Sequence, residues 1–129
     1  MQAISITILL LAAAACHVVA TFTSACSVWY VHGHETLTTE CQTWDPVKGK
    51  ILTNLDLNNC IGVDTGSNAM VWMTGGNAFT IHCRNCSLQN SEVVMQCECI
   101  DPQTGNKTSS SINLDDGITN QHDGSLTCP

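Results

Sequence analysis

The 129-residue chain is short of positive charge: four Lys and Arg stand against eleven Asp and Glu, which gives a formal net charge of −7 at pH 7. The four basic residues are scattered and form no cluster. Because a phosphate backbone attracts proteins through clustered Lys and Arg, the composition argues against nucleic acid as a partner. It argues against an anionic membrane surface for the same reason.

Aromatic residues are also few, with three Trp, two Phe and one Tyr, so Ile, Leu and Val have to supply the core. No window keeps apolar residues at three-to-four spacing for more than one helical turn, whereas short β-rich runs recur. Gly, Asn, Asp and Pro separate these runs and favour turns. We therefore predict an all-β fold with strands over residues 27–31, 36–43, 50–53, 70–72, 80–86, 93–99, 108–112 and 125–127.

Long apolar segments are missing after residue 20, but one opens the chain. Residues 4–15 are apolar, and Val18-Val19-Ala20 ends the stretch with small residues at the cleavage positions. This pattern is typical of a secretory signal peptide over residues 1–20, although the usual basic residue near the N-terminus is missing. An uncleaved membrane anchor is the alternative. We predict a secreted, extracellular protein whose residues 21–129 form one domain.

Cleavage before Thr21 removes Cys16 and leaves an even number of cysteines. In a short secreted chain this favours disulfides, here up to four. A four-thiolate zinc site is the alternative, because Cys83-x-x-Cys86 followed by Cys97-x-Cys99 has a spacing that zinc ligands use. An oxidising compartment favours disulfides, and we predict no metal and no cofactor. The cysteines concerned are Cys26, Cys41, Cys60, Cys83, Cys86, Cys97, Cys99 and Cys128.

Recognisable catalytic motifs are absent, since no Gly-x-Ser-x-Gly element and no convincing Ser/His/Asp arrangement occurs. Asp115-Asp116 or the pair of Glu35 and Glu40 could flank a glycosidic bond, but nothing in the sequence places two carboxylates across a cleft. His32-Gly33-His34-Glu35 could hold a metal ion, yet its place between two predicted strands favours an exposed hairpin loop. We predict that the protein is not an enzyme.

The chain does contain an internal repeat. Phe22-Thr-Ser-Ala-Cys26 returns as Phe79-Thr-Ile-His-Cys83, and Asp45-Pro46-x-x-Gly49 returns as Asp101-Pro102-x-x-Gly105. Two copies of about 55 residues are too few for a solenoid and favour one pseudo-twofold domain. The copies span residues 21–78 and 79–129.

Each copy closes on a similar phrase, Leu55–Ile61 in the first and Ile112–Ile118 in the second. Both phrases carry Asn and Asp where a single helical turn needs its amides capped. We interpret them as short helical turns whose acidic residues cap the backbone and do not react.

Two sequons for N-glycosylation occur in the second copy, Asn85-Cys86-Ser87 and Asn106-Lys107-Thr108. Modification would place both asparagines on the surface. The first sequon is less convincing, because its middle residue is expected to be in a disulfide.

The repeats resemble the cyanovirin-N homology family, over residues 22–126. The resemblance is carried by Phe22–Cys26, Cys41, Leu57, Asn58, Ile61, Phe79, Cys83-Arg84-Asn85, Leu88, Glu92 and Cys97, and most strongly by Ile112–Ile118 with Asn120 and Asp123–Leu126. It implies an all-β domain of two pseudo-symmetric halves that are intertwined by exchanged strands and stabilised by disulfides. The chain is similar to the secreted, cysteine-enriched members found in fungi.

The repeat and the resemblance imply two of the disulfides, Cys26–Cys41 and Cys83–Cys97. Cys86–Cys99 is a weaker local assignment, because both cysteines flank the same bridge and could exchange partners with it. Cys60–Cys128 is left by elimination. This bridge joins the two repeats, so it requires the intertwined arrangement.

The family's carbohydrate site near both termini is formed by residues before the first cysteine, after the second cysteine and in the final loop. Here these positions are Thr21, Ser24, Ala25, Gln42, Trp44, Asn120 and Asp123. Amides and carboxylates suit neighbouring sugar hydroxyls, because one planar group can bind two of them. This chain has one extra residue between Asn120 and Asp123. It also has Trp44 in place of a smaller residue, which could stack on a pyranose ring or block the pocket.

At the family's second site, a Glu and an Asn become Gly62 and Val63. Asp64, Asn77 and His82 remain as polar contacts, and we expect a weaker second site.

The resemblance implies a monomeric lectin that binds mannose-type oligosaccharides or glycoproteins without catalysis. The alternative is a small cysteine-rich effector or defence protein that keeps the scaffold but binds a protein partner. Exposed Trp29, Tyr30 and Trp44 would favour that alternative.

Overall fold

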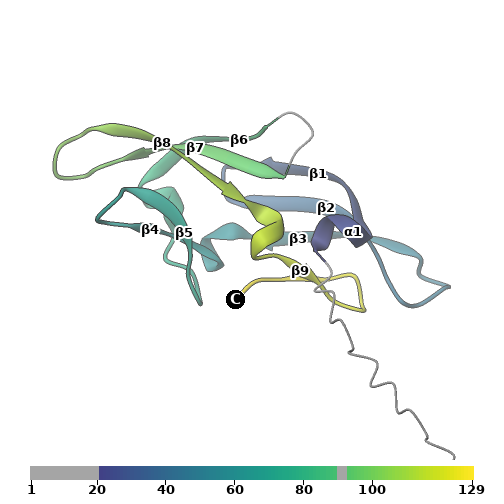
Figure 1. Ribbon diagram of the computed structural model, residues 1–129. Helices are drawn as coiled ribbons and strands as arrows, with labels where there is room; N and C mark the ends of the chain where they lie inside the picture. Colours follow the sequence, from purple (N-terminus) through teal and green to yellow (C-terminus); the bar gives the residue numbers. More distant parts are fainter. Residues whose placement is uncertain (1–20, 90–92) are drawn as a thin grey trace, which may run out of the picture.

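A computed structural model describes residues 21–89 and 93–129, so the predicted signal peptide lies outside the described residues. The regular elements are mostly short strands, with one helical turn at the start and three 3₁₀ turns (Figure 1). They are α1 (Phe22–Ala25), β1 (Cys26–His32), β2 (Thr36–Gln42), β3 (Lys50–Asp56), η1 (Leu57–Asn59), β4 (Ile61–Asp64), β5 (Ala69–Trp72), η2 (Phe79–Ile81), β6 (Cys83–Leu88), β7 (Val94–Ile100), β8 (Lys107–Asn113), η3 (Leu114–Asp116), β9 (Thr119–Asn120) and β10 (Leu126–Thr127).

Each repeat forms one three-stranded antiparallel sheet, β1-β2-β3 in the first and β6-β7-β8 in the second. Successive side chains of a strand point to opposite faces, so alternate residues of the central strands enter the core. In β2 the buried set includes Leu37 and Cys41, and in β7 it is Met95, Cys97 and Cys99. The prediction of an all-β fold is confirmed.

Each repeat also ends in a two-stranded hairpin that packs on the other repeat. The β4–β5 hairpin of the first repeat lies against the second sheet, where the Met70 amide donates to Ser110 Oγ at 2.9 Å and the Asn68 side chain donates to the Cys99 carbonyl at 3.0 Å. The β9–β10 hairpin of the second repeat lies beside β3 of the first (Figure 1). The halves are therefore intertwined, as the resemblance implied.

A matched pair of side-chain contacts repeats this exchange. The backbone amide and hydroxyl of Thr23 donate to the Asp115 carboxylate, and those of Thr80 donate to Asn58 Oδ1 at 3.2 and 3.0 Å. Thr23 and Thr80 follow the two repeated phenylalanines, and their acceptors lie in the two closing phrases. The helical turn that opens each repeat is thus held by the turn that closes the other.

The prediction of capped helical turns is confirmed at η1 and η3. The Asp56 side chain accepts from the Asn58 amide, and the Asn113 side chain accepts from the Asp115 amide. The second cap is therefore an Asn, and the Asp115 carboxylate joins the two repeats through Thr23 instead of capping its own turn.

The core lies where the two halves meet, and it uses the repeated apolar positions. Phe22 and Phe79 are fully buried, as are Leu57 and Leu114 of the closing phrases. Burying such side chains contributes about 1.5–3 kcal/mol each. Both repeats contribute a phenylalanine and a leucine to the same buried cluster. Neither repeat therefore completes this core alone.

All eight cysteines of the described residues form disulfides, as predicted, and Cys26–Cys41 and Cys60–Cys128 have the expected pairing. The Cys83–Cys97 and Cys86–Cys99 assignments are wrong, because the bonds are Cys83–Cys99 and Cys86–Cys97. Cys83 lies directly opposite Cys99 in the antiparallel pair of β6 and β7, and Ser87 lies opposite Gln96. The two bridges are therefore nested along the pair and do not cross, which makes Cys99 the counterpart of Cys41.

Three other expectations on strands differ from the structure. β4 and β9 were not predicted, because each directly follows a closing phrase and pairs over few residues. The strand expected over residues 80–86 begins only at Cys83, since Phe79–Ile81 form the turn η2. Ala78, with φ 45°, starts that turn in the left-handed region.

Candidate functional site

The positions predicted for the first carbohydrate site come from three segments, which the structure brings together. Thr21 pairs with Thr119 in an isolated β-bridge, which places the N-terminal segment beside β9 and Asn120. The Trp44 amide donates to the His122 carbonyl at 2.8 Å, which places the β2–β3 turn against the final loop. We call Thr21, Ser24, Gln42, Trp44, Asn120 and Asp123 the primary surface.

Trp44 has a definite position on this surface. Its ring stacks on the imidazole of His122, with the ring centroids 3.4 Å apart and the planes 18° from parallel. His122 lies between Asn120 and Asp123, where this chain has its extra residue. Since Trp44 is 72% exposed, the stack fixes its orientation and still leaves a large apolar surface open to solvent.

Polar groups of the primary surface keep free hydrogen-bonding capacity. Asp123 Oδ1 accepts from the amide of Ser125 at 3.0 Å and from its hydroxyl at 2.6 Å, and these bonds hold the pKa of the carboxyl below its usual value. Oδ2 of Asp123 and the side-chain amide of Asn120 have no partner within residues 21–89 and 93–129. Gln42 donates to the Thr43 carbonyl at 3.1 Å, which leaves its own amide oxygen to accept.

A second hollow of about 250 Å³ lies at the position that the pseudo-twofold repeat relates to the primary surface. It is lined by Val63, Thr65, Asn68, His82, Asp101, Pro102 and Gln103. Of the three residues expected at the second site, only His82 lines it. Asp101 and Pro102 were missed, although the repeat signals them, because they match Asp45 and Pro46 next to Trp44.

Asp64 and Asn77 lie outside this lining. The Asp64 carboxylate accepts from the Ser67 hydroxyl at 2.9 Å through one oxygen and from the Gly66 amide at 3.2 Å through the other. These bonds lower the pKa of Asp64 and tie it to its own turn. Asn77 lies by Gly62, where an added Cβ would come within 3.1 Å of Asn77 Cβ.

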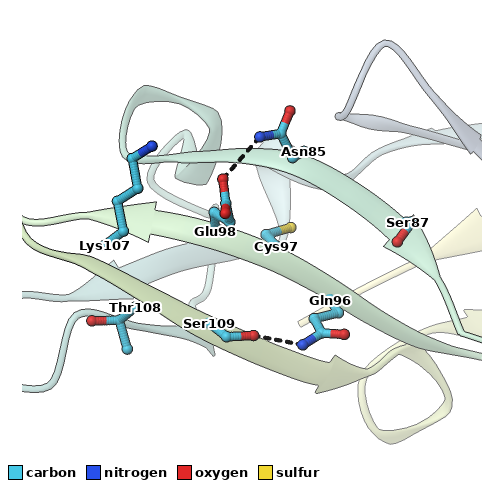
Figure 2. A pocket seen from close by; sticks show the side chains of 8 residues that line it. All are labelled: Asn85, Ser87, Gln96, Cys97, Glu98, Lys107, Thr108 and Ser109. Carbon is cyan, nitrogen blue, oxygen red and sulfur yellow. Dashed lines mark hydrogen bonds between the residues drawn. The ribbon is translucent and has the colours of Figure 1, made fainter.

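A polar groove of about 370 Å³ crosses the outer face of the second sheet (Figure 2). Its side chains bind one another. The side-chain amide of Asn85 donates to Glu98 Oε2 at 2.9 Å, and the side-chain amide of Gln96 donates to the Ser109 hydroxyl. Lys107 reaches over one end, and the other lining residues are Ser87, Cys97 and Thr108. The groove has no aromatic surface, and these mutual bonds occupy much of its polar capacity, so it is a weaker candidate than the primary surface.

Several of the carboxylates and histidines considered for catalysis or metal binding make hydrogen bonds within the fold or lie in turns. Asp115 is bound by Thr23. His32 Nε2 lies 2.9 Å from Thr38 Oγ1 at the end of β1, whereas His34, with φ 68°, lies in the following turn. Within the described ranges, no group of three or more His, Cys, Asp or Glu side chains is arranged to hold a metal ion. The same residues contain no helix long and apolar enough to cross a membrane.

Comparison with known proteins identifies this architecture. A model of the CVNH domain matches residues 22–127. The NMR structure of the CVNH protein of Gibberella zeae has a TM-score of 0.68 at 22% identity, over 83% of this chain and 95% of that one. The T. borchii CVNH protein gives 0.68 at 20% identity, over 85% and 100%.

A third similar structure, a MoCVNH3 variant, was solved in complex with (N-GlcNAc)4, and gives a TM-score of 0.69 at 18% identity, over 84% of this chain and 96% of that one. Among curated proteins, no sequence matches this chain. The match of the domain model to most of the chain, together with the exchanged hairpins seen in the structure, shows that this protein belongs to the CVNH family.

Proposed function

We propose that this protein is a secreted, monomeric lectin that binds mannose-type oligosaccharides on its primary surface and catalyses no reaction. One observation carries the proposal. An exposed Trp44, and an Asn120 side-chain amide and an Asp123 carboxylate oxygen that have no partner in the described residues, lie on adjoining segments of a CVNH fold.

The chemistry of these groups suits a sugar. A pyranose has hydroxyls around its edge and C–H groups on its faces, so it needs planar donors and acceptors beside an apolar plate. The amides and carboxylate can bind adjacent hydroxyls, and Trp44 provides the plate. A few such hydrogen bonds of about 1 kcal/mol net each, together with the contact to Trp44, predict a weak affinity, with a Kd nearer the millimolar than the micromolar range.

The identity of the glycan is tested most directly with an array of oligosaccharides probed by oxidised protein that begins at Thr21. Mannose-rich oligosaccharides are expected to bind. Oligomers of N-acetylglucosamine belong on the same array, because a structural neighbour was solved with (N-GlcNAc)4. Preference for the latter would contradict mannose specificity and keep the lectin function.

Two double variants test the location. Asn120→Ala with Asp123→Ala removes the free polar groups of the primary surface, so calorimetric titration should detect no binding, given a cost of about 1–3 kcal/mol for each lost partner. Asp64→Ala with Asn77→Ala is the matched control and should change affinity by less than about threefold. Both must keep the thermal stability of the wild type. Loss of binding in the control alone would contradict the assignment to the primary surface.

Absence of catalysis is checked by incubating the protein with the same oligosaccharides and measuring reducing ends. No release is expected. Steady release that follows protein concentration would establish a hydrolase instead.

A protein-binding function is the second candidate, favoured by apolar side chains on the surface. Tyr30, Val47, Leu52 and Ile81 are exposed in addition to Trp44. Tyr30 and Leu52 belong to the same three-stranded sheet. Trp29 does not contribute, because it is half-buried with its ring edge-on to Phe22 at 6.0 Å. Failure of the folded wild type to bind any glycan would favour this candidate.

A further inference from the structure

The two glycosylation sequons lie in different structural surroundings, which decides between them. Both are in the second repeat, one inside β6 and the other where the β7–β8 turn enters β8. An N-linked glycan is bulky, so it needs a surface asparagine whose side-chain nitrogen points away from the protein and is free to be modified.

Asn85 is held on the sheet. Its side-chain nitrogen, the atom that would carry the sugar, donates to Glu98 Oε2 at 2.9 Å (Figure 2). Its neighbour Cys86 is bonded to Cys97 on the adjacent strand. Its backbone has φ 54° in the irregularity between Arg84 and Ser87. Once the Cys86–Cys97 bridge closes, the middle residue of the sequon is fixed to β7 and the Asn85 nitrogen is engaged by Glu98.

Asn106 is exposed, as Asn85 is, but its side-chain amide has no hydrogen-bonding partner in the part of the chain that the structure describes. Its carbonyl accepts from the Asp101 amide at 2.9 Å, which closes the turn, and Gly105 permits that turn with φ 71°. Thr108, the hydroxyl residue of the sequon, is also exposed.

We propose that Asn106 carries an N-linked oligosaccharide, that Asn85 does not, and that this glycan covers the second hollow. The inference rests on the proposed secretion, because the donor is a polyprenyl-diphosphate-linked oligosaccharide of the secretory pathway. The Asn106 side-chain nitrogen forms the bond to C1 of the sugar. The C1–O bond to the diphosphate breaks, and the amide proton is lost as the polyprenyl diphosphate leaves.

The position of Asn106 determines which surface the glycan would cover. The turn that it closes also supplies Asp101, Pro102 and Gln103 to the second hollow. The β2–β3 turn, which carries Trp44, lies at the opposite end of the molecule (Figure 1). A bulky sugar on Asn106 therefore shields the second hollow and leaves the primary surface open.

Secretion of the full chain from a eukaryotic host tests the modification. Peptide-N-glycosidase treatment in ¹⁸O-water should label residue 106 and reduce the mass of wild type and of Asn85→Gln equally, with no change in Asn106→Gln. Protein secreted and cleaved before Thr21 but lacking sugar at Asn106, or carrying it at Asn85, overturns the inference. Retention of uncleaved chain in the cell contradicts secretion itself, and the inference with it, so the two failures are distinguishable.

Shielding has its own readout, because His82 lines the second hollow. Diethyl pyrocarbonate should modify His82 severalfold more slowly in glycosylated wild type than in Asn106→Gln. His34, exposed in the β1–β2 turn, is the internal control and should react equally in both. Equal reactivity of His82 would show that the glycan leaves the hollow open.

Discussion

Removing the Cys60–Cys128 disulfide tests the exchange of hairpins, because this is the bridge that joins the two repeats. The perturbation is Cys60→Ala together with Cys128→Ala. Cys60 is fully buried and follows η1, whereas Cys128 is half-buried and follows β10. Alanine at both positions removes the cross-link and adds no polar group to the core.

The expected cost follows from loop closure. The bridge spans 68 residues of sequence, but Cys83–Cys99 shortens the path between its ends. An effective loop of about 50 residues corresponds to ~4 kcal/mol in the chain-entropy treatment. For a domain of this size, the melting temperature should fall by roughly 15 °C or more.

Cys86→Ala with Cys97→Ala is the matched control. This bridge is nested inside Cys83–Cys99, so it closes only a small additional ring. A ring of about seven residues gives ~2 kcal/mol, and the control should therefore lose about half as much stability.

Urea unfolding and native-state hydrogen exchange measure the outcome. The Cys60/Cys128 variant should lose exchange protection first in β9 and β10, whose attachment to the first repeat the bridge secures. Equal destabilisation of the two variants, or unchanged protection in β9 and β10, would refute the reasoning.

Three further predictions follow from other contacts. Gly117→Ala should destabilise the fold by about 1–3 kcal/mol in thermal unfolding, because a Cβ there would lie 2.4 Å from the Trp72 ring; Gly62→Ala should cost less, because its nearest atom is the flexible Met73 Sδ. Thr23→Ala should cost more than Thr80→Ala in urea unfolding, since a bond to the Asp115 carboxylate contributes about 1.5–3 kcal/mol and one to a neutral amide about 1; equal losses would contradict the assignment. The lowered pKa values of Asp64 and Asp123 predict a stability contribution that is present above the unfolded pKa of about 3.9 and lost as pH falls through the lower folded value. Asp123→Asn should therefore lower stability slightly at neutral pH and flatten the acid limb of stability against pH, as measured by urea unfolding at pH 7 and pH 3.

The overall architecture could be predicted because the residues that recur in the two repeats are the ones that form the core. The phenylalanines, the closing leucines and the cysteines recur in order. Strands with clear alternation, such as β2 and β7, were found within one residue or so. β4 and β9 were not, since their pairing depends on packing against the other repeat and leaves little local pattern.

The disulfide pairing and the second hollow show what the sequence signal could not settle. The spacing of Cys97 to Asp101-Pro102 equals that of Cys41 to Asp45-Pro46, which favoured Cys97 as the counterpart of Cys41. Strand register decides the matter instead, because the irregularity in β6 places Cys99 opposite Cys83. The stack of Trp44 on His122 was equally beyond reach, as it depends on the final loop returning to the β2–β3 turn.

The exchanged hairpins also bear on how the chain is made. The first sheet is complete at Asp56, yet the hairpin that packs beside it begins at Thr119. During synthesis the first repeat is therefore expected to expose its core face, which includes Phe22, to solvent until the second repeat has emerged from the ribosome. Contacts between residues so distant in sequence form slowly. Folding is thus expected to be largely post-translational. Exchange of hairpins with a neighbouring chain is the expected error, and the Cys60–Cys128 bridge prevents it once the bridge has closed within one molecule.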